Sequence, residues 1–256
     1  MERPETTAAF MARHQAHDYE ALISQWKELS ASLGLHMKNY ARLGDFDLYY
    51  VETPVSGQKN ASYISAGMHG DEAAPPWALL EWTRNNLSRF QSEPFLFFPC
   101  LNPWGFVNNV RTDERGRDMN RLFHDGTAEG IREWRDVVGE RRLRICINLH
   151  EDYDAQGMYV YELNPETRRA EAVLQAAGKV IPPDMRAEID DSDAEKGVIR
   201  RKVTPDTLPP LPGLPEAIYL HFHHSDASLT IESPSEFALC DRIDAHVLGL
   251  SAALDY

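Results

Sequence analysis

The sequence predicts a single α/β domain spanning residues 1–256, with a mixed, mostly parallel β-sheet and helices on both of its faces. Between residues 61 and 149, short apolar runs alternate with helical segments, a pattern typical of parallel sheets that are covered on both sides. The chain has 256 residues, of which 43% are hydrophobic, and this is enough for one sizeable core. We find no linker or internal repeat that divides it.

The N-terminal part predicts a helix followed by a hairpin. Residues up to about His17 are expected to form an arm or an irregular first helix. Asp18 can cap a helix that runs to Leu33 and stops at Gly34. Two runs of strand composition follow, separated by Gly44-Asp45, and they predict a hairpin at the sheet edge: His36–Leu43 and Phe46–Glu52.

The rest of the chain predicts the alternating body of the domain. The expected strands are Ala61–Ala66, Phe95–Leu101, Arg144–Leu149, Met158–Leu163, Ile218–His223 and Ala227–Glu232. The expected helices are Ala73–Phe90, Ala128–Arg141, Glu166–Val180 and Phe237–Leu254. Residues 181–215 contain seven prolines and a charged cluster, so we expect a long surface excursion there, with a small strand pair, that overhangs the site.

Composition limits the class of partner. The net charge of −14 and the pI of about 5.1 argue against nucleic acid or an anionic membrane as a partner. The first thirty residues contain no apolar signal core, and no apolar run approaches the length of a membrane span. The three cysteines are few, odd in number and widely spaced, which is typical of reduced thiols. We therefore expect a soluble, cytoplasmic protein.

The stretch Gly67-Met68-His69-Gly70-Asp71-Glu72 lies between a predicted buried strand and a predicted helix. It therefore falls at the carboxyl end of a strand, where open α/β sheets place their sites. A histidine and a glutamate three residues apart on such a turn can reach one ion, and zinc binds nitrogen and carboxylate oxygen ligands. Taken alone, His-x-x-Glu is more often a solvated turn, so its meaning depends on the rest of the chain.

Three further stretches stand at the ends of predicted strands. They are Asn102-Pro103-Trp104-Gly105 with Arg111 and Asp118-Met119-Asn120-Arg121, then Asn148-Leu149-His150-Glu151-Asp152, and last Thr230-Ile231-Glu232-Ser233-Pro234. Together with His69-Gly70-Asp71-Glu72, they resemble the zinc carboxypeptidase family of the carboxypeptidase A type. The resemblance runs from about Ala61 to the C-terminal helix. It depends on the order and the strand-end placement of all four stretches, because no single stretch is specific.

The resemblance implies a metal site and a general base. His69, Glu72 and His150 would bind one zinc ion, and the fourth position would be left for water. Glu232 would take a proton from that water and later deliver it to the leaving amine. Chemistry agrees with this assignment, because zinc lowers the pKa of a bound water to about 7 and a nearby carboxylate can then act as acid and base.

The resemblance also implies three residues that hold the substrate. Arg111 would stabilise the oxyanion, although Arg117 remains a competitor for that role. Asn120 and Arg121 would bind a substrate carboxylate, for which a guanidinium can supply two parallel hydrogen bonds. Tyr219 has no motif that would assign it to the site.

Some residues near the motifs have ordinary explanations. Glu151 and Asp152 would support the ligands or be solvated, because zinc already has three protein ligands. His221, His223 and His224 form a dense group that could be a second metal site. Their spacing favours alternating strand residues near the active site instead.

Three functions remain open. The first is a zinc carboxypeptidase that removes a C-terminal residue from a small peptide, for example a cell-wall peptide. The second is an N-acyl amino acid deacylase like aspartoacylase or succinylglutamate desuccinylase, which share the fold and ligand types. The Asn-Pro-x-Gly turn, the Arg111-to-Asn120 spacing and the Thr-Ile-Glu-Ser-Pro strand favour the peptidase. The third is a binding module without catalysis, which the complete set of site residues disfavours.

Overall fold

The computed structural model describes residues 16–54, 60–163, 168–204, 206, 208 and 212–255. The expected arm before His17 therefore lies almost wholly outside the described residues. Within the described part, no helix is long and apolar enough to cross a membrane.

The described chain is organised around one mixed sheet of eight strands, in the order β1-β2-β4-β3-β5-β10-β6-β9. The four central strands β4, β3, β5 and β10 are parallel to one another. Toward one edge, β2 pairs antiparallel with β4 and with β1, and toward the other edge, β6 pairs antiparallel with β10 and parallel with β9. The single α/β domain with a mixed, mostly parallel sheet is thus confirmed. The strand bounds are β1 His36–Leu43, β2 Phe46–Glu52, β3 Ala61–Ser65, β4 Phe95–Phe98, β5 Leu143–Asp152, β6 Tyr159–Glu162, β9 Val198–Arg200 and β10 Ser228–Pro234.

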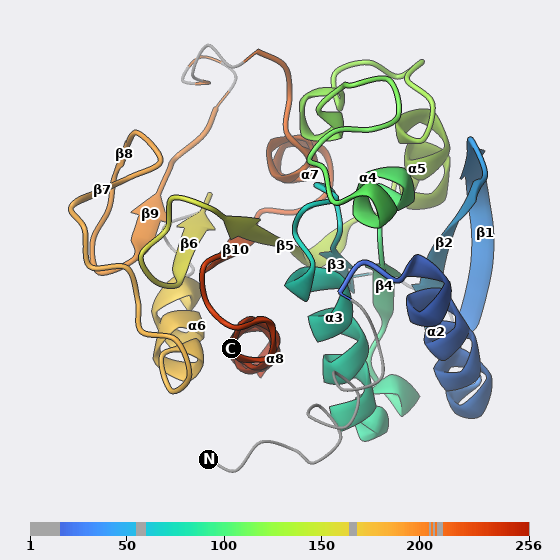
Figure 1. Ribbon diagram of the computed structural model, residues 1–256, viewed down its shortest axis with the longest axis horizontal. Helices are drawn as coiled ribbons and strands as arrows, with labels where there is room; N and C mark the ends of the chain where they lie inside the picture. Colours follow the sequence, from blue (N-terminus) through green and yellow to red (C-terminus); the bar gives the residue numbers. More distant parts are fainter. Residues whose placement is uncertain are drawn as a thin grey trace.

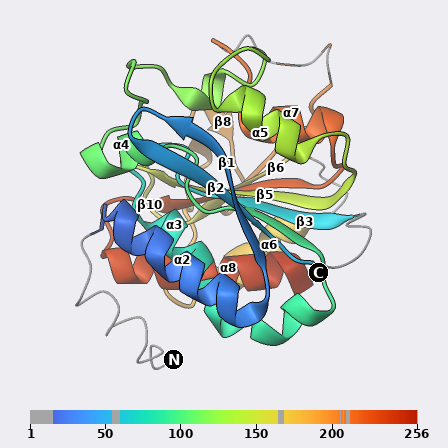
Figure 2. The ribbon, with the colours of Figure 1, turned by 90° about the vertical axis from the view of Figure 1, so that its right-hand side faces the viewer.

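Helices cover both faces of this sheet (Figure 1, Figure 2). One face carries α2 (Tyr19–Leu33), α3 (Ala74–Asn85), α6 (Arg169–Ala177) and α8 (Leu239–Asp255). The other face carries α5 (Ile131–Val138) and α7 (Glu216–His223). The remaining described elements are short: α4 (Pro103–Asn108), two 3₁₀ turns at Leu87–Gln91 and Met119–Arg121, and strands β7 (Glu188–Ile189) and β8 (Ser192–Asp193).

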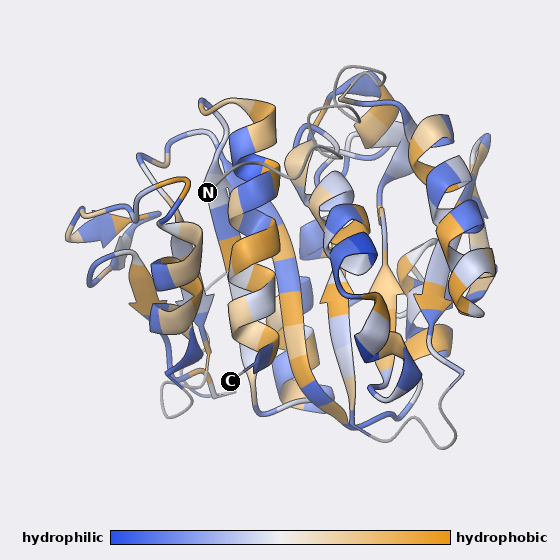
Figure 3. Cartoon of the chain, turned by 90° about the horizontal axis from the view of Figure 1, so that it is seen from below, coloured by the Kyte–Doolittle hydropathy of each residue, from blue (hydrophilic) through white to orange (hydrophobic). Residues whose placement is uncertain are grey.

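Strand residues alternate between two hydrophobic cores. Ile64 of β3 belongs to the core under α3 and α8, whereas its neighbour Tyr63 belongs to the core under α5. Such alternation follows from the two-residue period of a strand, and apolar runs without polar alternation result because both faces are covered. Figure 3 shows hydrophobic residues along the central strands, with hydrophilic residues interspersed on the covering helices.

The N-terminal predictions are confirmed within the described residues. The Asp18 side chain accepts a hydrogen bond from the Ala21 N–H at 2.8 Å, and α2 ends at Gly34, whose φ is +65°. An L residue with a side chain rarely adopts that left-handed conformation, so glycine suits the stop. β1 and β2 form the expected antiparallel hairpin at the sheet edge.

The predicted strand at Ile218–His223 is wrong, because this segment is helix α7. The alternating apolar and histidine residues imitate a strand pattern, but tertiary contacts decide the outcome. Glu216, at the first turn, is fully buried and accepts hydrogen bonds from Tyr63 Oη and Ser65 Oγ. Its backbone N–H donates to Asn120 Oδ1 at 2.9 Å, which satisfies one of the free donors at a helix start.

The excursion is more ordered than expected. β7 and β8 form the anticipated small strand pair. The chain then returns through β9, which pairs parallel with β6 and becomes an edge strand of the main sheet. The middle of the excursion therefore lies beside β6, the strand that neighbours β10.

Candidate metal and substrate site

The turn that carries His69 packs directly against the Asn-Pro-Trp-Gly turn. A Cβ atom placed on Gly70 would lie 1.8 Å from the backbone carbon of Gly105, which no side chain can tolerate. The two motifs are therefore in backbone contact, and glycine at position 70 is needed for this approach. Asn102 completes the junction, because its backbone N–H donates to the Gly67 carbonyl at 2.8 Å.

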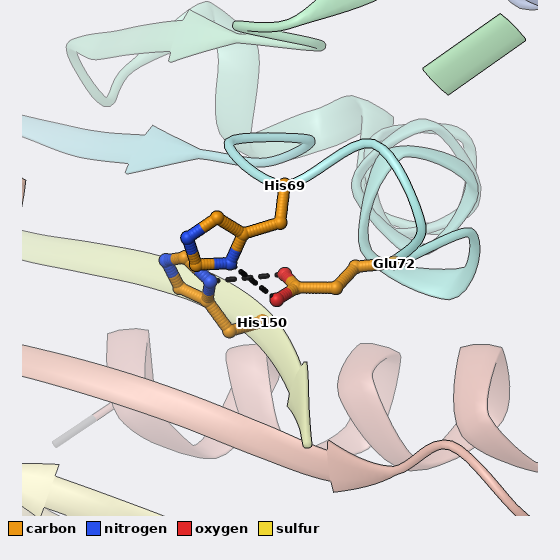
Figure 4. Close-up of side chains that lie close together, drawn as sticks. All are labelled: His69, Glu72 and His150. Carbon is orange, nitrogen blue, oxygen red and sulfur yellow. Dashed lines mark hydrogen bonds and ion pairs between the residues drawn. The ribbon is translucent and has the colours of Figure 1, made fainter. Parts of the chain in front are cut away.

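His69, Glu72 and His150 converge at the carboxyl ends of two neighbouring strands. His69 and Glu72 lie in the turn between β3 and α3, and His150 lies in β5 (Figure 4). His69 Nδ1 is 2.5 Å from Glu72 Oε1, and His150 Nδ1 is 2.9 Å from Glu72 Oε2. All three side chains are buried, and one ligand atom from each lies within 4.8 Å of the others. This group can hold a metal ion.

The electrostatics of the metal-free group agree with that role. Burial alone would lower the pKa of His69, but the Glu72 and Asp118 carboxylates raise it to about 9. Burial alone would raise the pKa of Glu72, but the two imidazoles lower it to about 2. Burial alone would also lower the pKa of His150, but Glu72 raises it, so this carboxylate attracts positive charge to the centre of the group. Two imidazole nitrogens and one carboxylate oxygen are ligand types that suit zinc.

Asp118 supports this group, a role that the sequence prediction did not assign. Its Oδ1 lies 3.3 Å from His69 Nε2, and its Oδ2 accepts hydrogen bonds from Arg111 Nε and Nη2 at 3.1 and 2.9 Å. Burial would raise the pKa of Asp118, but His69 and Arg111 hold it well below its ordinary value. A carboxylate on the far nitrogen of a ligand histidine fixes the ring orientation. The sequence signal that could have suggested this role is the position of Asp118 in the Asp-Met-Asn-Arg motif.

Arg111 is held over the metal group by the loop after α4. Asn102 Nδ2 donates to the Arg111 and Thr112 carbonyls at 3.3 and 3.1 Å, so the motif asparagine fixes the start of this loop. Arg111 Nη1 lies 3.3 Å from His69 Nδ1. The competing Arg117 pairs with Asp113 at 2.7 Å and does not line the pocket, so the geometry favours Arg111.

Glu232 stands beside the metal group because of strand register. β10 pairs with β5 so that Glu232 lies opposite His150, and it pairs with β6 so that Glu232 lies opposite Tyr159. The carboxylate makes no hydrogen bond with any described residue. Burial raises its pKa to about 8, against the lowering effect of His150. A carboxyl group with a pKa near neutrality is suited to both accepting and donating a proton.

All seven predicted site residues line one pocket of about 240 Å³. Asn120 and Arg121 lie in the 3₁₀ turn at Met119–Arg121, whose start is capped by Asp118. Among the described residues, Arg121 Nη1 donates to the neighbouring Asn120 carbonyl, at 3.0 Å. The rest of the lining was not predicted as site residues. Glu151, Asp152 and Thr230 lie within the motif stretches, whereas the other residues have no motif: Tyr159, Tyr161, Leu163, Asp190, Arg201, Pro215, Ala217 and Ile218.

The histidine group of α7 does not belong to this pocket. They are not alternating strand residues, because His221 and His223 lie in helix α7 and His224 caps its end. They are not neighbours of the metal group, because none of the three lines the pocket. The Tyr219 ring centre lies 4.4 Å from that of His223, with the rings tilted, and 5.7 Å from that of Trp134 in an edge-to-face contact. Tyr219 packs against the core under α5, and its lack of a site motif is consistent with that position.

A buried ion pair between Arg242 and Glu151 links helix α8 to the residue that follows His150. Glu151 Oε1 accepts the Ala74 N–H at 2.6 Å, where α3 begins, and its other oxygen binds Arg242. Burial raises the pKa of Glu151 to about 7, even though Arg242 opposes this rise. The pair therefore anchors the first turn of α3, directly after Glu72.

Replacing Arg242 by methionine is expected to destabilise the fold by about 3–5 kcal/mol, because an unpaired carboxylate remains buried. Urea unfolding at pH 8, followed by tryptophan fluorescence, measures this change. The double variant Arg242→Met/Glu151→Gln is the matched control and should recover most of the lost stability. Equal losses in the single and double variants would contradict the explanation.

Solved structures with the same architecture include a presumed metallopeptidase from Shewanella denitrificans, with a TM-score of 0.81 and 22% identity over 94% of this chain and 90% of that one. A second, from Shewanella amazonensis, has a TM-score of 0.80 and 24% identity over 94% of both chains. A metallo-carboxypeptidase from Burkholderia cenocepacia has a TM-score of 0.69 and 16% identity over 92% of this chain and 68% of that one. The chain has a metallo-carboxypeptidase fold.

Comparison of the sequence with protein families adds a second similarity, besides the metallo-carboxypeptidase fold. The model of the succinylglutamate desuccinylase/aspartoacylase catalytic domain matches residues 58–182. The matched segment contains all three residues of the metal group but ends before Glu232. No curated protein matches the chain. The findings support the suspected relationship to zinc carboxypeptidases and to the aspartoacylase group.

Proposed function

We propose that this protein is a zinc-dependent hydrolase that cleaves an amide bond next to a free carboxylate. One observation carries the proposal: the His69–Glu72–His150 group, the buried Glu232 and the arginines Arg111 and Arg121 line a single pocket. A zinc ion held by this group would polarise the carbonyl of the amide and acidify the attacking water. The remaining steps belong to the protein's own side chains.

Glu232 moves the protons in this proposal. Its carboxylate lies beside His150 and has no hydrogen-bond partner among the described residues, so it is available to the attacking water. It would accept a proton from the water and then donate it to the leaving amine. Arg111, held by Asp118, would place its guanidinium against the carbonyl oxygen as negative charge develops there.

Asn120 and Arg121 would bind the free carboxylate of the substrate. The oxygen of the Asn120 amide is used by the Glu216 N–H, which leaves the amide nitrogen as its donor. Arg121 forms no ion pair with a described carboxylate, so its charge can be used by the substrate. A carboxylate held at this point fixes which amide lies next to the metal group.

Two substrate classes fit this arrangement. The first is a small peptide, for example a cell-wall peptide, that loses its C-terminal residue. The second is an N-acyl amino acid, and the match to the succinylglutamate desuccinylase/aspartoacylase domain favours it specifically. Both substrates release an amino acid whose carboxylate is free, so the proposed residue roles are the same.

The direct test is metal analysis followed by hydrolysis of a substrate panel. We expect about one zinc ion per chain, the number that a single three-ligand site implies. The panel should contain blocked dipeptides and N-acyl amino acids, each with a free or an amidated terminus. Metal binding without hydrolysis of any member would favour a binding module on the same fold.

Replacing Arg121 by alanine is expected to raise KM and to leave kcat closer to normal. The reason is that a carboxylate contact present before and during the reaction contributes uniform binding. Steady-state kinetics on a free and an amidated substrate measure both parameters, and the variant should lose the preference for the free terminus. Arg115→Ala, which removes an exposed arginine outside the pocket, is the control. Wild-type behaviour of Arg121→Ala would instead favour an internal amide.

A further inference from the structure

Glu216 is a fully buried carboxylate that forms no ion pair with a described lysine or arginine. Its Oε1 accepts a hydrogen bond from Tyr63 Oη, and its Oε2 accepts one from Ser65 Oγ at 3.0 Å. Burying a carboxylate among neutral donors is costly, and an apolar residue would avoid this cost. We therefore expect the value of Glu216 to lie in the geometry that its hydrogen bonds fix.

The side chain of Glu216 joins helix α7 to the two strands that position the metal group. Tyr63 and Ser65 belong to β3, which leads into the turn of His69. Ser65 is paired with Asn148 of β5, and Asn148 Nδ2 donates to Ser65 Oγ at 2.9 Å. The Ser65 hydroxyl thus accepts from β5 and donates to Glu216. The first turn of α7 is thereby fixed relative to both strands.

Trp134 of α5, which lies beside α7 on the same face of the sheet (Figure 2), sets the direction of the Tyr63 hydroxyl. Its Nε1 donates to Tyr63 Oη at 2.8 Å, so the proton of this hydroxyl is left for Glu216. Tyr63, Ser65, Trp134 and Glu216 are all buried. A buried network in which every donor has its acceptor favours a single arrangement of these side chains.

The same turn of α7 holds the proposed carboxylate site from the other side. The Glu216 N–H donates to Asn120 Oδ1 at 2.9 Å, and the Leu214 N–H donates to the Arg121 carbonyl at 3.2 Å. A Cβ atom on Gly213 would lie 2.1 Å from that carbonyl oxygen, so the two backbones are in contact. The segment that starts α7 therefore sets the position of the turn that carries Asn120 and Arg121.

The contact with Glu216 decides which end of the Asn120 amide can face a ligand. A backbone N–H can only donate, so the atom opposite it must be the amide oxygen, and the nitrogen remains for a substrate. α7 has only eight residues, and Pro215 before it supplies no capping side chain. Because so short a helix is marginal by itself, its first turn depends on the buried hydrogen bonds of Glu216. Without them, the Asn120 amide could turn its oxygen toward a carboxylate and repel it.

We propose that Glu216 is the positioning residue of the site that binds the substrate carboxylate. It does not line the pocket, and it acts through Asn120, which does. This inference rests on the proposed function, in which Asn120 and Arg121 hold that carboxylate. Loss of the Glu216 side chain should therefore weaken binding of a free terminus, whereas the metal group and the proton transfer by Glu232 should remain.

Glu216→Met removes both buried hydrogen bonds at nearly constant side-chain length. We expect KM for a substrate with a free terminus to rise by about tenfold to a hundredfold, the scale of a hydrogen bond to a charged group, with kcat closer to normal. KM for the matching amidated substrate should stay unchanged, which a general loss of stability would not produce. Glu216→Gln can still accept from one hydroxyl and donate to the other, so it should restore most of the wild-type KM. Glu81→Met is the control, because Glu81 is also buried but lies in α3, outside the pocket.

A double variant tests the path through Asn120. Asn120→Ala should raise KM by itself, and adding Glu216→Met should then have little further effect. Effects of the two changes that add in full would overturn the inference. If Glu216→Met does not fold, Tyr63→Phe replaces it, because this change removes one of the two hydrogen bonds and leaves the carboxylate in place.

NMR relaxation of the Asn120 side-chain amide separates this inference from the proposed function, because it requires no substrate. Asn120→Ala identifies the signal by its loss. We expect a rigid amide in wild type and in Glu81→Met, and a mobile one in Glu216→Met. This result would support the inference even if no carboxylate substrate were hydrolysed. An amide that is mobile in wild type, or equally rigid in Glu216→Met, would overturn it even if the proposed hydrolysis were observed.

Discussion

Replacing Glu232 by glutamine is expected to lower kcat by at least about a hundredfold, the usual scale of general acid–base catalysis. Glutamine has nearly the same size and can occupy the same place opposite His150, but it cannot accept the proton of the attacking water. Metal content should stay at the wild-type level, because Glu232 is not one of the proposed ligands. Steady-state kinetics and elemental analysis of the same preparation measure the two quantities together.

Glu236→Gln is the matched control for this variant. Glu236 follows the same strand, is exposed and does not line the pocket, so its loss changes the net charge equally without touching the site. Its kcat should remain close to that of wild type. If Glu232→Gln kept a normal kcat with the metal bound, the proposed proton transfer would be wrong.

Replacing His69 or His150 by alanine is expected to remove the metal. Loss of an outer-shell partner alone lowers metal affinity by about 10–100-fold, so loss of a ligand should exceed this effect. Elemental analysis after dialysis gives the bound metal, and the hydrolytic activity should fall in proportion to it. Two remaining ligands are fewer than the three that catalytic zinc sites use.

His36→Ala serves as the control for the ligand variants, because His36 is an exposed histidine of β1, an edge strand far along the sheet from β5. It should keep the metal and the activity. Full metal retention in both His69→Ala and His150→Ala would contradict the ligand assignment. Retention in only one of them would require a different third ligand.

The residues of the metal group could be predicted from the sequence because each lies at, or shortly after, the carboxyl end of a buried strand in a largely parallel sheet. Strand ends of that kind meet at one edge, so ligands that are distant in sequence converge without any knowledge of the detailed packing. The order of the motifs in the sequence likewise placed Glu232 at this edge of the sheet. What local sequence could not provide was the function of Asp118, since its contact with His69 joins residues that are 49 positions apart, by their numbers.

The predictions that were wrong or missing also have physical causes. Residues 218–223 alternate as a strand does, but the buried hydrogen bonds of Glu216 and the burial of Ile218 and Leu220 favour the helix. Tyr159, Tyr161 and Arg201 were missed because their position in the pocket comes from the pairing of β6 with β10 and β9. Register of that kind is a long-range property, and no short motif records it.

The pairing of β10 with β5 fixes the position of Glu232, the proposed proton carrier, relative to His150 of the metal group. In β10, Thr230 and Glu232 face the pocket, whereas Leu229 and Ile231 belong to the core under α8. A slip of one residue would bring Ile231 or Ser233 opposite His150 and turn the Glu232 carboxylate toward that core. The burial of Leu229 and Ile231 thus opposes the very displacement that would disable the site. Hydrophobic packing on one face of the sheet keeps the catalytic alignment on the other.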